Sequence, residues 1–465
     1  MPSSVEPHLV WFRRDLRLDD NPAWSGHDGP TVALFVLDPR PWHAAGPRRQ
    51  SLLAAHLRSL DTALRQRGGG LLVLGGDPVD TVPRAAAALG ARAVSWNADV
   101  SGYAQRRDAA VAAALRSDGI EVATHWGTLV HAPGAIRAKS TGTVPRVFTP
   151  FHKQWAATEW DDWTLDGDVS VLDPATLPGL AHLPVVPVPE ASDGTVGGGD
   201  VAHARLRRWL DDVDGYPDRR DRPDDAEGTS HLSADLRFGT LSPRTVATVV
   251  GDSTVGRGAF VRQLAWRDWY AHLFVERPEL ATHAMAPGLD DIAWLDDPEG
   301  LEAWRTGRTG YPIVDAGMRE LAATGWMHNR VRMITASFLV KDLLIDWRLG
   351  EAHFRRELVD FEVSQNVGNW QWVAGTGPDA APYFRIFNPI MQGRKFDPDG
   401  AYVRRWVPEL RELGDRDIHT PWEVAPLDLA VAGITLGETY PWPIVDHAMA
   451  RDRTLAAYGA AKGTA

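Results

Sequence analysis

Residues 71–97 have the sequence LLVLGGDPVDTVPRAAAALGARAVSWN, and this stretch decides the fold class. Short apolar runs stand at both ends, LLVLGG and AVSWN, and such runs are typical of strands that are covered on both faces. Between them, Pro78 to Leu89 has the spacing and the alanine content of a helix. A strand, a helix and a second strand in this order build parallel sheets. The stretch therefore predicts an α/β region.

The same alternation covers the first 130 residues. Three further apolar runs are predicted strands: HLVWF at 8–12, TVALFVLD at 31–38 and EVATHW at 121–126. Helical spacing is also present from Arg49 to Arg67 and from Gly102 to Ser117. We therefore expect an N-terminal α/β domain over residues 1–130, with a doubly wound parallel sheet.

The character of the chain then changes twice. Residues 161–200 are rich in Pro, Gly and Asp and lack a hydrophobic period, which is typical of a long connection between domains. After Val201 the strand signal disappears, and helical patterns occur at 203–213, 259–276, 312–325, 329–347 and 351–360. The expected organisation is an α/β domain over 1–130, a connection over 131–200 and an all-α domain over 201–465.

Composition limits the class of protein. At roughly 100–200 residues per domain, the 465 residues suggest two to four domains, and the absence of cysteine excludes disulfides and thiolate metal sites. No run of 18 apolar residues occurs, and charges interrupt the N-terminus too early for a signal peptide, so we expect a cytoplasmic protein without a membrane segment. The net charge of −12 argues by itself against broad nucleic-acid binding. The 20 tryptophans suit core packing, base stacking or transport of an electron hole, and composition does not choose among these uses.

Common catalytic signatures are missing from the sequence. GxGxxG, GxxxxGK[ST] and HExxH do not occur, so Rossmann dinucleotide, P-loop and zinc hydrolase sites have no support, and we expect no metal. The glycines at 68–76 are better explained by a turn that enters a buried strand. What remains is a helical half with closely grouped Asn, Arg, Asp and Trp.

Long motifs of this helical half resemble the photolyase/cryptochrome family. They are YPDRRDRPDDAEGTSHLSADLRFGTLSPR (216–244), QLAWRDWY (263–270), GYPIVDAGMRELAATGWMHNRVRMITASFLVKDLLIDWR (310–348) and QNVGNWQWVAGTGPDAAPYFRIFNP (365–389). WFRRDLRLDDNPA (11–23) is similar to the start of the same family. The resemblance covers nearly the whole chain and is nearest to class I cyclobutane pyrimidine dimer photolyases. It implies an N-terminal α/β domain, a long connection and a helical domain that holds FAD.

The resemblance assigns a set of residues to FAD. Thr229, Ser230 and Ser233 stand just before or at the start of a predicted helix, where hydroxyls and N–H groups suit phosphate oxygens, although a plain N-cap is the alternative. Arg332 and Asp360 match a pair beside the isoalloxazine ring, in which the Arg stabilises the anionic reduced flavin; an ordinary ion pair is the alternative. Asn366 matches the residue that faces flavin N5 and can accept from N5–H, whereas the residues alone suggest a turn. The full set comprises Tyr216, Thr229, Ser230, His231, Leu232, Ser233, Arg267, Asn329, Arg332, Asp360, Glu362 and Asn366, and Glu362 stands where close relatives often have Asp.

Three tryptophans match the family's electron-transfer chain. Trp370, Trp347 and Trp294 would run from the flavin to the surface and re-reduce oxidised flavin in light. Without the resemblance, each would be assigned to core packing.

The resemblance also implies a pocket for the lesion, because photolyases are base-flipping enzymes. Trp266 and Trp372 would offer flat apolar walls to the flipped dimer, and Asn329 would bond the base edges. Two arginines would hold the phosphates beside the lesion. The full set comprises Arg220, Gln263, Trp266, Asn329, Arg330, Met333 and Trp372.

Gln263 departs from the nearest class, whose members usually have Glu here. Gln occurs at this position in (6-4) photolyases and animal-type cryptochromes, but Asn329 and Met333 stand where (6-4) enzymes carry the His residues that donate a proton. We therefore expect a lyase that repairs cyclobutane pyrimidine dimers in DNA by light-driven electron transfer from reduced FAD. The alternatives are a cryptochrome-type photoreceptor without repair and a (6-4) photolyase. The complete pocket and the lack of a long extension past Ala465 favour the enzyme, which we expect to be a monomer.

The N-terminal domain of this family often holds an antenna chromophore. WNADVSGYAQRRD (96–108) lacks the Asn-Glu pair used for methenyltetrahydrofolate and has Tyr103 and Ala104 there. It is more similar to members that bind 8-hydroxy-5-deazaflavin, for which FVLDP (35–39), Arg49 and Asp99 would line the site. The alternative is that these are strand-end residues and that no antenna binds.

Overall fold

The computed structural model describes residues 6–160, 163, 165, 167–192, 194–285, 287–380 and 382–463. The chain divides into two compact units: unit 1 comprises Met1–Asp214 and Ser230–Pro278, and unit 2 comprises Gly215–Thr229 and Glu279–Ala465. Positions 161, 162, 164, 166 and 193 of the predicted connection lie outside the described residues. The predicted domain boundaries at residues 130 and 200 stay a prediction.

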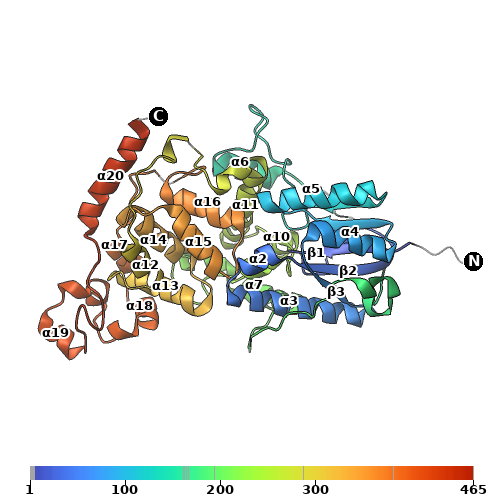
Figure 1. Cartoon of the computed structure of the whole chain (residues 1–465). Coiled ribbons are helices and arrows are strands. Elements are labelled where there is room, and N and C mark those ends of the chain that lie inside the picture. The colour runs from blue at the N-terminus through green and yellow to red at the C-terminus, as the bar shows by residue number, and fades with distance from the viewer. Residues whose placement is uncertain are drawn as a thin grey trace, which may run out of the picture. The chain divides into compact units, whose positions relative to one another are not determined.

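Unit 1 contains a parallel sheet with the strand order β3-β2-β1-β4-β5 (Figure 1). Its strands are β1 (His8–Phe12), β2 (Gly29–Leu37), β3 (Leu71–Gly75), β4 (Ala93–Asn97) and β5 (Glu121–His125). Strand β1 pairs with both β2 and β4, so the chain winds outward from β1 in both directions. The predicted doubly wound α/β sheet is confirmed. A strand that was not predicted, β6 (Val169–Val171), pairs with the first residues of β2.

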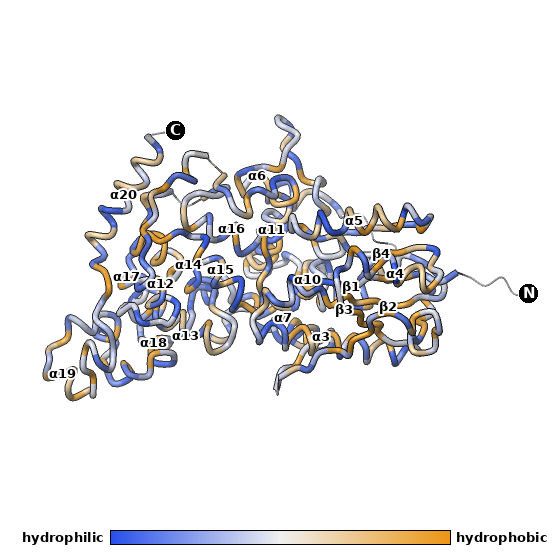
Figure 2. The backbone as a smooth tube through the Cα atoms, in the orientation of Figure 1, coloured by the Kyte–Doolittle hydropathy of each residue, from blue (hydrophilic) through white to orange (hydrophobic). Residues whose placement is uncertain are grey.

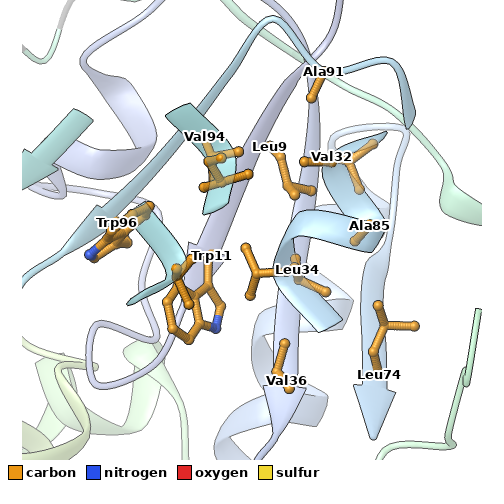
Figure 3. Close-up of a cluster of buried hydrophobic side chains, with 14 of the residues drawn as sticks. Leu9, Trp11, Val32, Leu34, Val36, Leu74, Ala85, Ala91, Val94 and Trp96 are labelled. Carbon is orange, nitrogen blue, oxygen red and sulfur yellow. The ribbon is translucent and has the colours of Figure 1, made fainter. Parts of the chain in front are cut away.

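Helices cover both faces of this sheet. Successive side chains of a strand point to opposite faces, so the apolar strands form one buried cluster on each face. On one face, Leu9 and Trp11 pack with side chains of β2, β4, α4 (Pro78–Leu89) and α5 (Gly102–Ser117), as Figure 3 shows for part of the cluster. On the other face, Val10 and Phe12 pack with α1 (Pro22–Ser25) and α3 (Pro47–Gln66). Burial on both faces explains why β1 to β4 are nearly continuous apolar runs (Figure 2).

The rest of unit 1 is mainly helical. Its further elements are α2 (Pro39–His43), α6 (Phe148–Ala157), η1 (Pro174–Thr176), η2 (Pro178–His182), α7 (Gly199–Asp212), η3 (Val213–Gly215), α9 (Ser233–Phe238), α10 (Pro243–Val250) and α11 (Val255–Glu276). The buried carboxylate of Asp268 on α11 accepts hydrogen bonds from the backbone N–H of Val130 and His131 and from Nε1 of Trp155 on α6. These bonds hold α11 against α6 and the segment before it.

Among its described residues, unit 2 consists of helices and loops. Its elements are α8 (Tyr216–Arg219), η4 (Pro278–Ala281), η5 (Pro287–Leu289), α12 (Pro298–Arg305), α13 (Pro312–Thr324), α14 (Asn329–Ser337), η6 (Phe338–Asp342), α15 (Trp347–Glu357), α16 (Val363–Ala374), α17 (Pro389–Phe396), α18 (Ala401–Trp406), η7 (Pro408–Leu410), η8 (Asp417–His419), η9 (Pro421–Glu423), α19 (Pro426–Val431) and α20 (His447–Gly463). The all-α prediction for this part is confirmed. No helix within the described ranges is both long and apolar enough to span a membrane.

One predicted helix is divided. The pattern at 329–347 predicts a continuous helix, but α14 passes into a π-helical turn, η6, and a break precedes α15. Leu344 adopts a left-handed conformation with φ of 54° in this break, and the side chain of Asp346 accepts from the N–H of Arg348 as the N-cap of α15. The break sets the start of α15 at Trp347.

Candidate functional site

Unit 2 contains a pocket of about 530 Å³, partly open to solvent, between α14, α15, α16 and the segment before α16. The lining is partly apolar, with Ala336, Phe354, Leu358, Phe361 and Val373 among its members. The pocket also brings together many of the residues predicted from the sequence, namely Asn329, Arg332, Met333, Asp360, Glu362, Asn366 and Trp370.

Arg332 and Asp360 form a two-point ion pair in this lining. Nη1 and Nη2 of Arg332 lie 3.2 and 2.8 Å from the two carboxylate oxygens of Asp360, and Nε donates to the carbonyl of Met327 at 2.7 Å. The Asp360 side chain is 3% exposed, whereas that of Arg332 is 25% exposed. The guanidinium is therefore fixed in direction but still accessible, so it can stabilise negative charge on a ligand.

The amide of Asn366 has a fixed orientation. Its Nδ2 donates to the carbonyl oxygen of Glu351 at 3.2 Å and to the Glu351 carboxylate at 2.9 Å. Both partners can only accept, so the amide nitrogen must face Glu351. No hydrogen bond among the described residues engages Oδ1, which leaves an acceptor on a residue of the pocket wall. Asn366 lies inside α16, so the alternative that it is a turn residue is wrong.

Glu351 is a site residue that the sequence analysis did not identify. It is buried in α15, and its carboxylate also accepts from Nη2 of Arg355 at 2.6 Å. The Glu351–Arg355 spacing of four residues predicts that ion pair. Its contact with Asn366, 15 positions away, could not be read from spacing.

The three predicted electron-relay tryptophans all lie in unit 2. Trp370 lines the pocket, and Gly350 packs so closely against it that an added Cβ would lie 2.2 Å from the indole. Trp347 is three residues before Gly350 on α15, so it lies on the same side of that helix. The backbone N–H of Leu295, next to Trp294, donates to the carbonyl of Leu344 at 2.8 Å. Trp370 and Trp347 are buried and Trp294 is half-buried.

The residues predicted to hold the FAD phosphates are divided between the two units. Thr229 belongs to unit 2, and its Oγ1 is buried without a hydrogen-bond partner among the described residues. Ser233 begins α9 in unit 1, but the N-cap of α9 is Leu232, without a side-chain bond to the helix. The plain N-cap alternative is therefore wrong. Ser230 Oγ accepts instead from the N–H of Leu232 at 3.3 Å, and His231 has a left-handed φ of 53°.

Other predicted residues of unit 1 are held by local contacts. Arg267 is buried and donates to the carbonyls of Thr128 and Leu236. Gln263 donates from Nε2 to the carbonyl of Ala259 at 3.1 Å, one turn earlier on α11. How these residues take part in cofactor or lesion binding stays a prediction.

Arg220 and Arg330 of unit 2, which are predicted to bind the phosphates beside the lesion, differ in their surroundings. Nη2 of Arg330 lies 2.9 Å from Asp221, and its guanidinium lies over the ring of Phe396. The guanidinium of Arg220 lies 5.1 Å from the ring centre of Tyr216. Tyr216 is buried on α8, and neither it nor the half-buried Trp372 belongs to the pocket lining.

Of the predicted antenna residues, Asp38 and Asp99 follow the carboxyl ends of β2 and β4, whereas Arg49 lies in the first turn of α3. Asp99 pairs with Arg14 at 3.0 Å, and although burial alone favours protonation, Arg14 and the neighbouring arginines hold the pKa of Asp99 below its usual range. Asp38 accepts from the hydroxyl of Tyr103, whose pKa is raised to about 12 by burial and by that bond. The buried Arg49 donates to the carbonyl of Ala44. Within the described ranges, no cluster of His, Cys, Asp or Glu could hold a metal ion.

Two family models match the chain. Residues 8–166 match DNA photolyase, and residues 260–460 match the FAD binding domain of DNA photolyase. A deoxyribodipyrimidine photo-lyase of Agrobacterium fabrum is 41% identical over the full length of both chains.

Solved structures with the same fold include photolyases and a cryptochrome. A class III photolyase from Agrobacterium tumefaciens has a TM-score of 0.88 and 38% identity, over 100% of this chain and 99% of that one. A cryptochrome from Synechocystis sp. PCC6803 has a TM-score of 0.86 and 30% identity, over 98% and 100% of the two chains. An archaeal photolyase from Sulfolobus tokodaii, with two FAD molecules, has a TM-score of 0.82 and 31% identity, over 98% and 100%.

Proposed function

Because the chain belongs to the DNA photolyase family, we propose that it repairs cyclobutane pyrimidine dimers in DNA in a light-driven reaction that depends on FAD. The resemblance inferred from the sequence is confirmed by these matches. The observation that carries the proposal is one pocket wall that combines the Arg332–Asp360 pair, the oriented amide of Asn366 and Trp370.

The residues present fit a flavin. The apolar part of the lining suits an aromatic ring system, and the unpartnered Oγ1 of Thr229 offers a hydroxyl to a phosphate. FAD, when bound, would supply light absorption and the electron that opens the dimer. Arg332 would stabilise negative charge in the pocket, with Asp360 fixing its direction. Asn366 would accept a hydrogen bond through Oδ1, which favours a protonated nitrogen on the ligand.

We assign the tryptophans of unit 2 to electron supply. Trp370 lines the pocket and contacts Gly350 of α15, the helix that begins at Trp347. Leu344, just before that helix, accepts from the N–H of Leu295, next to Trp294. Trp294 is the partly exposed member of the three. This gradient from a buried to a partly exposed indole supports a route that ends at solvent.

We assign the lesion contacts as the resemblance implies them. Trp266 and Trp372 would form the apolar walls, and Gln263, Asn329 and Met333 would contact the bases. Arg220 would contact phosphate directly. Arg330 would have to leave its ion pair with Asp221 to bind a phosphate, or bind both groups at once.

A cryptochrome-type photoreceptor is the second candidate, favoured by the 30% identity to the Synechocystis cryptochrome. Class I membership within the family stays a prediction, since a class III photolyase has the same fold at 38% identity. An antenna also stays a proposal. The Sulfolobus photolyase holds two FAD molecules, which implies a novel light-harvesting cofactor in that protein, whereas we favour an 8-hydroxy-5-deazaflavin type at Arg49 and Asp99 here.

The deciding experiment irradiates the purified FAD-loaded protein with DNA that contains cyclobutane dimers. We expect the dimers to disappear in light and to persist in the dark and without protein. DNA that contains (6-4) lesions serves as the parallel substrate and should stay unrepaired. A light-induced flavin response without loss of dimers would favour the photoreceptor, and repair of (6-4) lesions alone would favour a (6-4) photolyase.

A further inference from the structure

Lys341 is a buried lysine that the proposed reaction does not use. It is 1% exposed, and no ion pair with it is formed among the described residues. Lysine is almost never fully buried without a charged partner. Lys341 lies in the π-helical turn η6, and such turns are frequent at functional sites. Its surroundings in unit 2 therefore bear on function.

Lys341 contacts a tyrosine of α20. Its Nζ lies 3.7 Å from the ring centre of Tyr458 and donates to the carbonyl oxygen of Ala374 at 2.9 Å. The hydroxyl of Tyr458 donates to the same carbonyl oxygen at 2.7 Å. The amine and the phenol therefore share one acceptor, and a small rotation of the lysine side chain can bring Nζ to the hydroxyl.

Tyr458 also lies against the last indole of the assigned electron relay. The ring centres of Trp294 and Tyr458 are 6.0 Å apart, and the two planes are inclined by 87°. Nε1 of Trp294 is buried without a hydrogen-bond partner among the described residues, so an oxidised indole has no base there to take its proton. An oxidised Trp294 therefore keeps its positive charge and can draw an electron from Tyr458.

We propose that Lys341 controls whether the electron relay ends at Trp294 or extends to Tyr458. The inference rests on the proposed electron supply through Trp294. A charged Lys341 keeps Tyr458 reduced, because a cation 3.7 Å from the ring centre opposes the loss of an electron from that ring. The phenolic proton has no base in this state, since the carbonyl of Ala374 only accepts a hydrogen bond. The relay then ends at Trp294.

A neutral Lys341 lets the relay extend by one step. One electron passes from Tyr458 to the oxidised indole of Trp294, and the phenolic proton passes to Nζ of Lys341. The products are a neutral tyrosyl radical, a restored Trp294 and a lysine ammonium, so electrons, protons and charge balance. Tyr458 does not lose its proton beforehand, because burial, reinforced by Asp346, raises its pKa above the usual range. The proton acceptor therefore decides the step.

Both forms of Lys341 are populated near neutral pH. Burial, reinforced by Lys462 of α20, lowers the pKa of Lys341 to about 7. The carboxylate of Asp342 contacts Nδ1 of His447 at 2.6 Å, and Arg453 donates to the carbonyl of Asp342. Burial raises the pKa of Asp342 to about 6, so this group titrates close to Lys341 and requires its own control.

The other helices that pack against η6 add no free charge. Helix α16 contains no ionisable residue, and both arginines of α14 are ion-paired. The arginines and carboxylates of α15 are ion-paired as well. Burial lowers the pKa of His353 on α15 to about 4, so it stays neutral. The pH dependence near the tyrosine therefore belongs to Lys341 and Asp342.

The test uses full-length protein with oxidised FAD, which is illuminated by a flash without an external donor. Electron paramagnetic resonance then distinguishes tryptophan radicals from tyrosyl radicals. The neutral fraction of Lys341 rises about tenfold between about pH 6 and about pH 8. The tyrosyl share of the radicals should rise by about the same factor, at the expense of the Trp294 radical.

Four variants assign the signal. Lys341→Met keeps a long side chain without a base and should form the Trp294 radical but no tyrosyl radical at either pH. Tyr458→Phe should give the same result. Tyr383→Phe removes the ring that stacks on Tyr458 at 6.2 Å, and it should keep the pH-dependent tyrosyl signal. Asp342→Asn removes the second titrating group, can still accept from His447, and should also keep this signal.

A tyrosyl radical in Lys341→Met overturns the inference, and so does a tyrosyl share in the wild type that is absent or unchanged at both pH values. Failure of the proposed electron supply has a different signature, because no tryptophan radical would then form at either pH. Dimer repair by protein with chemically reduced flavin does not pass through Lys341. Absence of that repair in the wild type would count against the proposed function alone.

Discussion

Replacement of Glu351 tests whether this residue sets the orientation of the Asn366 amide. The substitution Glu351→Ala removes the carboxylate that accepts from Nδ2 of Asn366 at 2.9 Å and leaves only the backbone carbonyl, at 3.2 Å. It also removes the partner of Arg355, at 2.6 Å. The two losses differ in size, because Asn366 is buried and the Arg355 side chain is 45% exposed.

The expected cost follows from these surroundings. A hydrogen bond to a charged group contributes about 1.5–3 kcal/mol. An exposed ion pair with a spacing of four residues on a helix contributes only about 0.3–0.5 kcal/mol. Glu351→Ala should therefore lower the free energy of unfolding by about 2–3 kcal/mol, whereas Arg355→Ala should lower it by less than about 1 kcal/mol.

A double-mutant cycle with Asn366→Ala isolates the contact. Urea unfolding of each variant, followed by far-ultraviolet circular dichroism, gives the free energies. In the Asn366→Ala background, Glu351→Ala should cost no more than Arg355→Ala does alone. Glu351→Gln serves as the conservative variant: its Oε1 can still accept from Asn366, so flavin retention should stay near that of the wild type, while Glu351→Ala loses flavin. An equal cost of Glu351→Ala in both backgrounds would refute the argument.

Three further predictions concern electron supply, pH and the lesion pocket. Trp294→Phe should abolish light-driven reduction of the oxidised flavin with an external donor, yet leave repair intact once the flavin is chemically reduced; loss of repair by the pre-reduced variant would make Trp294 structural. Burial, reinforced by Lys462, lowers the pKa of Lys341 from 10.5 to about 7, so the unfolded chain binds more protons between these values and stability rises with pH. The rise in the free energy of unfolding should reach about 1.4 kcal/mol per pH unit between pH 7 and 9, and Lys341→Met should remove this rise. An equal rise in the variant would contradict the assignment of this pH dependence to Lys341. Gln263→Glu should leave the affinity for dimers within about tenfold, near 1.4 kcal/mol, and keep or raise the repair yield without (6-4) activity; a loss of dimer repair would show that the amide is required.

The sheet of unit 1 could be predicted because local and global signals agree. Strands β1 to β4 are apolar runs bounded by turn residues, and their burial on both faces makes the strand pattern easy to recognise, whereas the edge strand β5 is only partly buried. Strand β6 was missed because it has only three residues, which is too short for any periodic signal. Helix α6 had a usable signal: Phe148, Phe151 and Trp155 are its buried residues and recur with helical spacing.

The division of the 329–347 segment could not be predicted from its residues. FLVKDLLIDW is apolar enough to continue α14, and a periodic pattern does not distinguish an α-helix from a π-helical turn. The break depends on the left-handed Leu344 and on the Asp346 cap, which act together with tertiary contacts. The positions of Lys341 and Asp342 in the core likewise depend on α20, whose Thr454 donates to the carbonyl of Lys341.

The candidate site was predictable only through the resemblance. Nothing in the local sequence joins Arg332 to Asp360, 28 positions later, although the structure places them 2.8 Å apart. Spacing also suggests a turn at Asn366, because glycine follows two residues later in QNVGN. The helix forms there nonetheless, since the buried face of α16 includes Val367, Trp370 and Val373.

Two neighbouring residues of α15 set the positions of two residues of α16. Gly350 leaves the space that the Trp370 indole fills, and an added Cβ would also lie 2.5 Å from Leu339. Glu351, the next residue, holds Asn366, which is one helical turn before Trp370. Because residues four apart on a helix share a face, Asn366 and Trp370 both line the pocket. The packing of α15 on α16 therefore fixes the amide and the indole together, so the group that would contact the flavin nitrogen and the first indole of the relay depend on the same helix register.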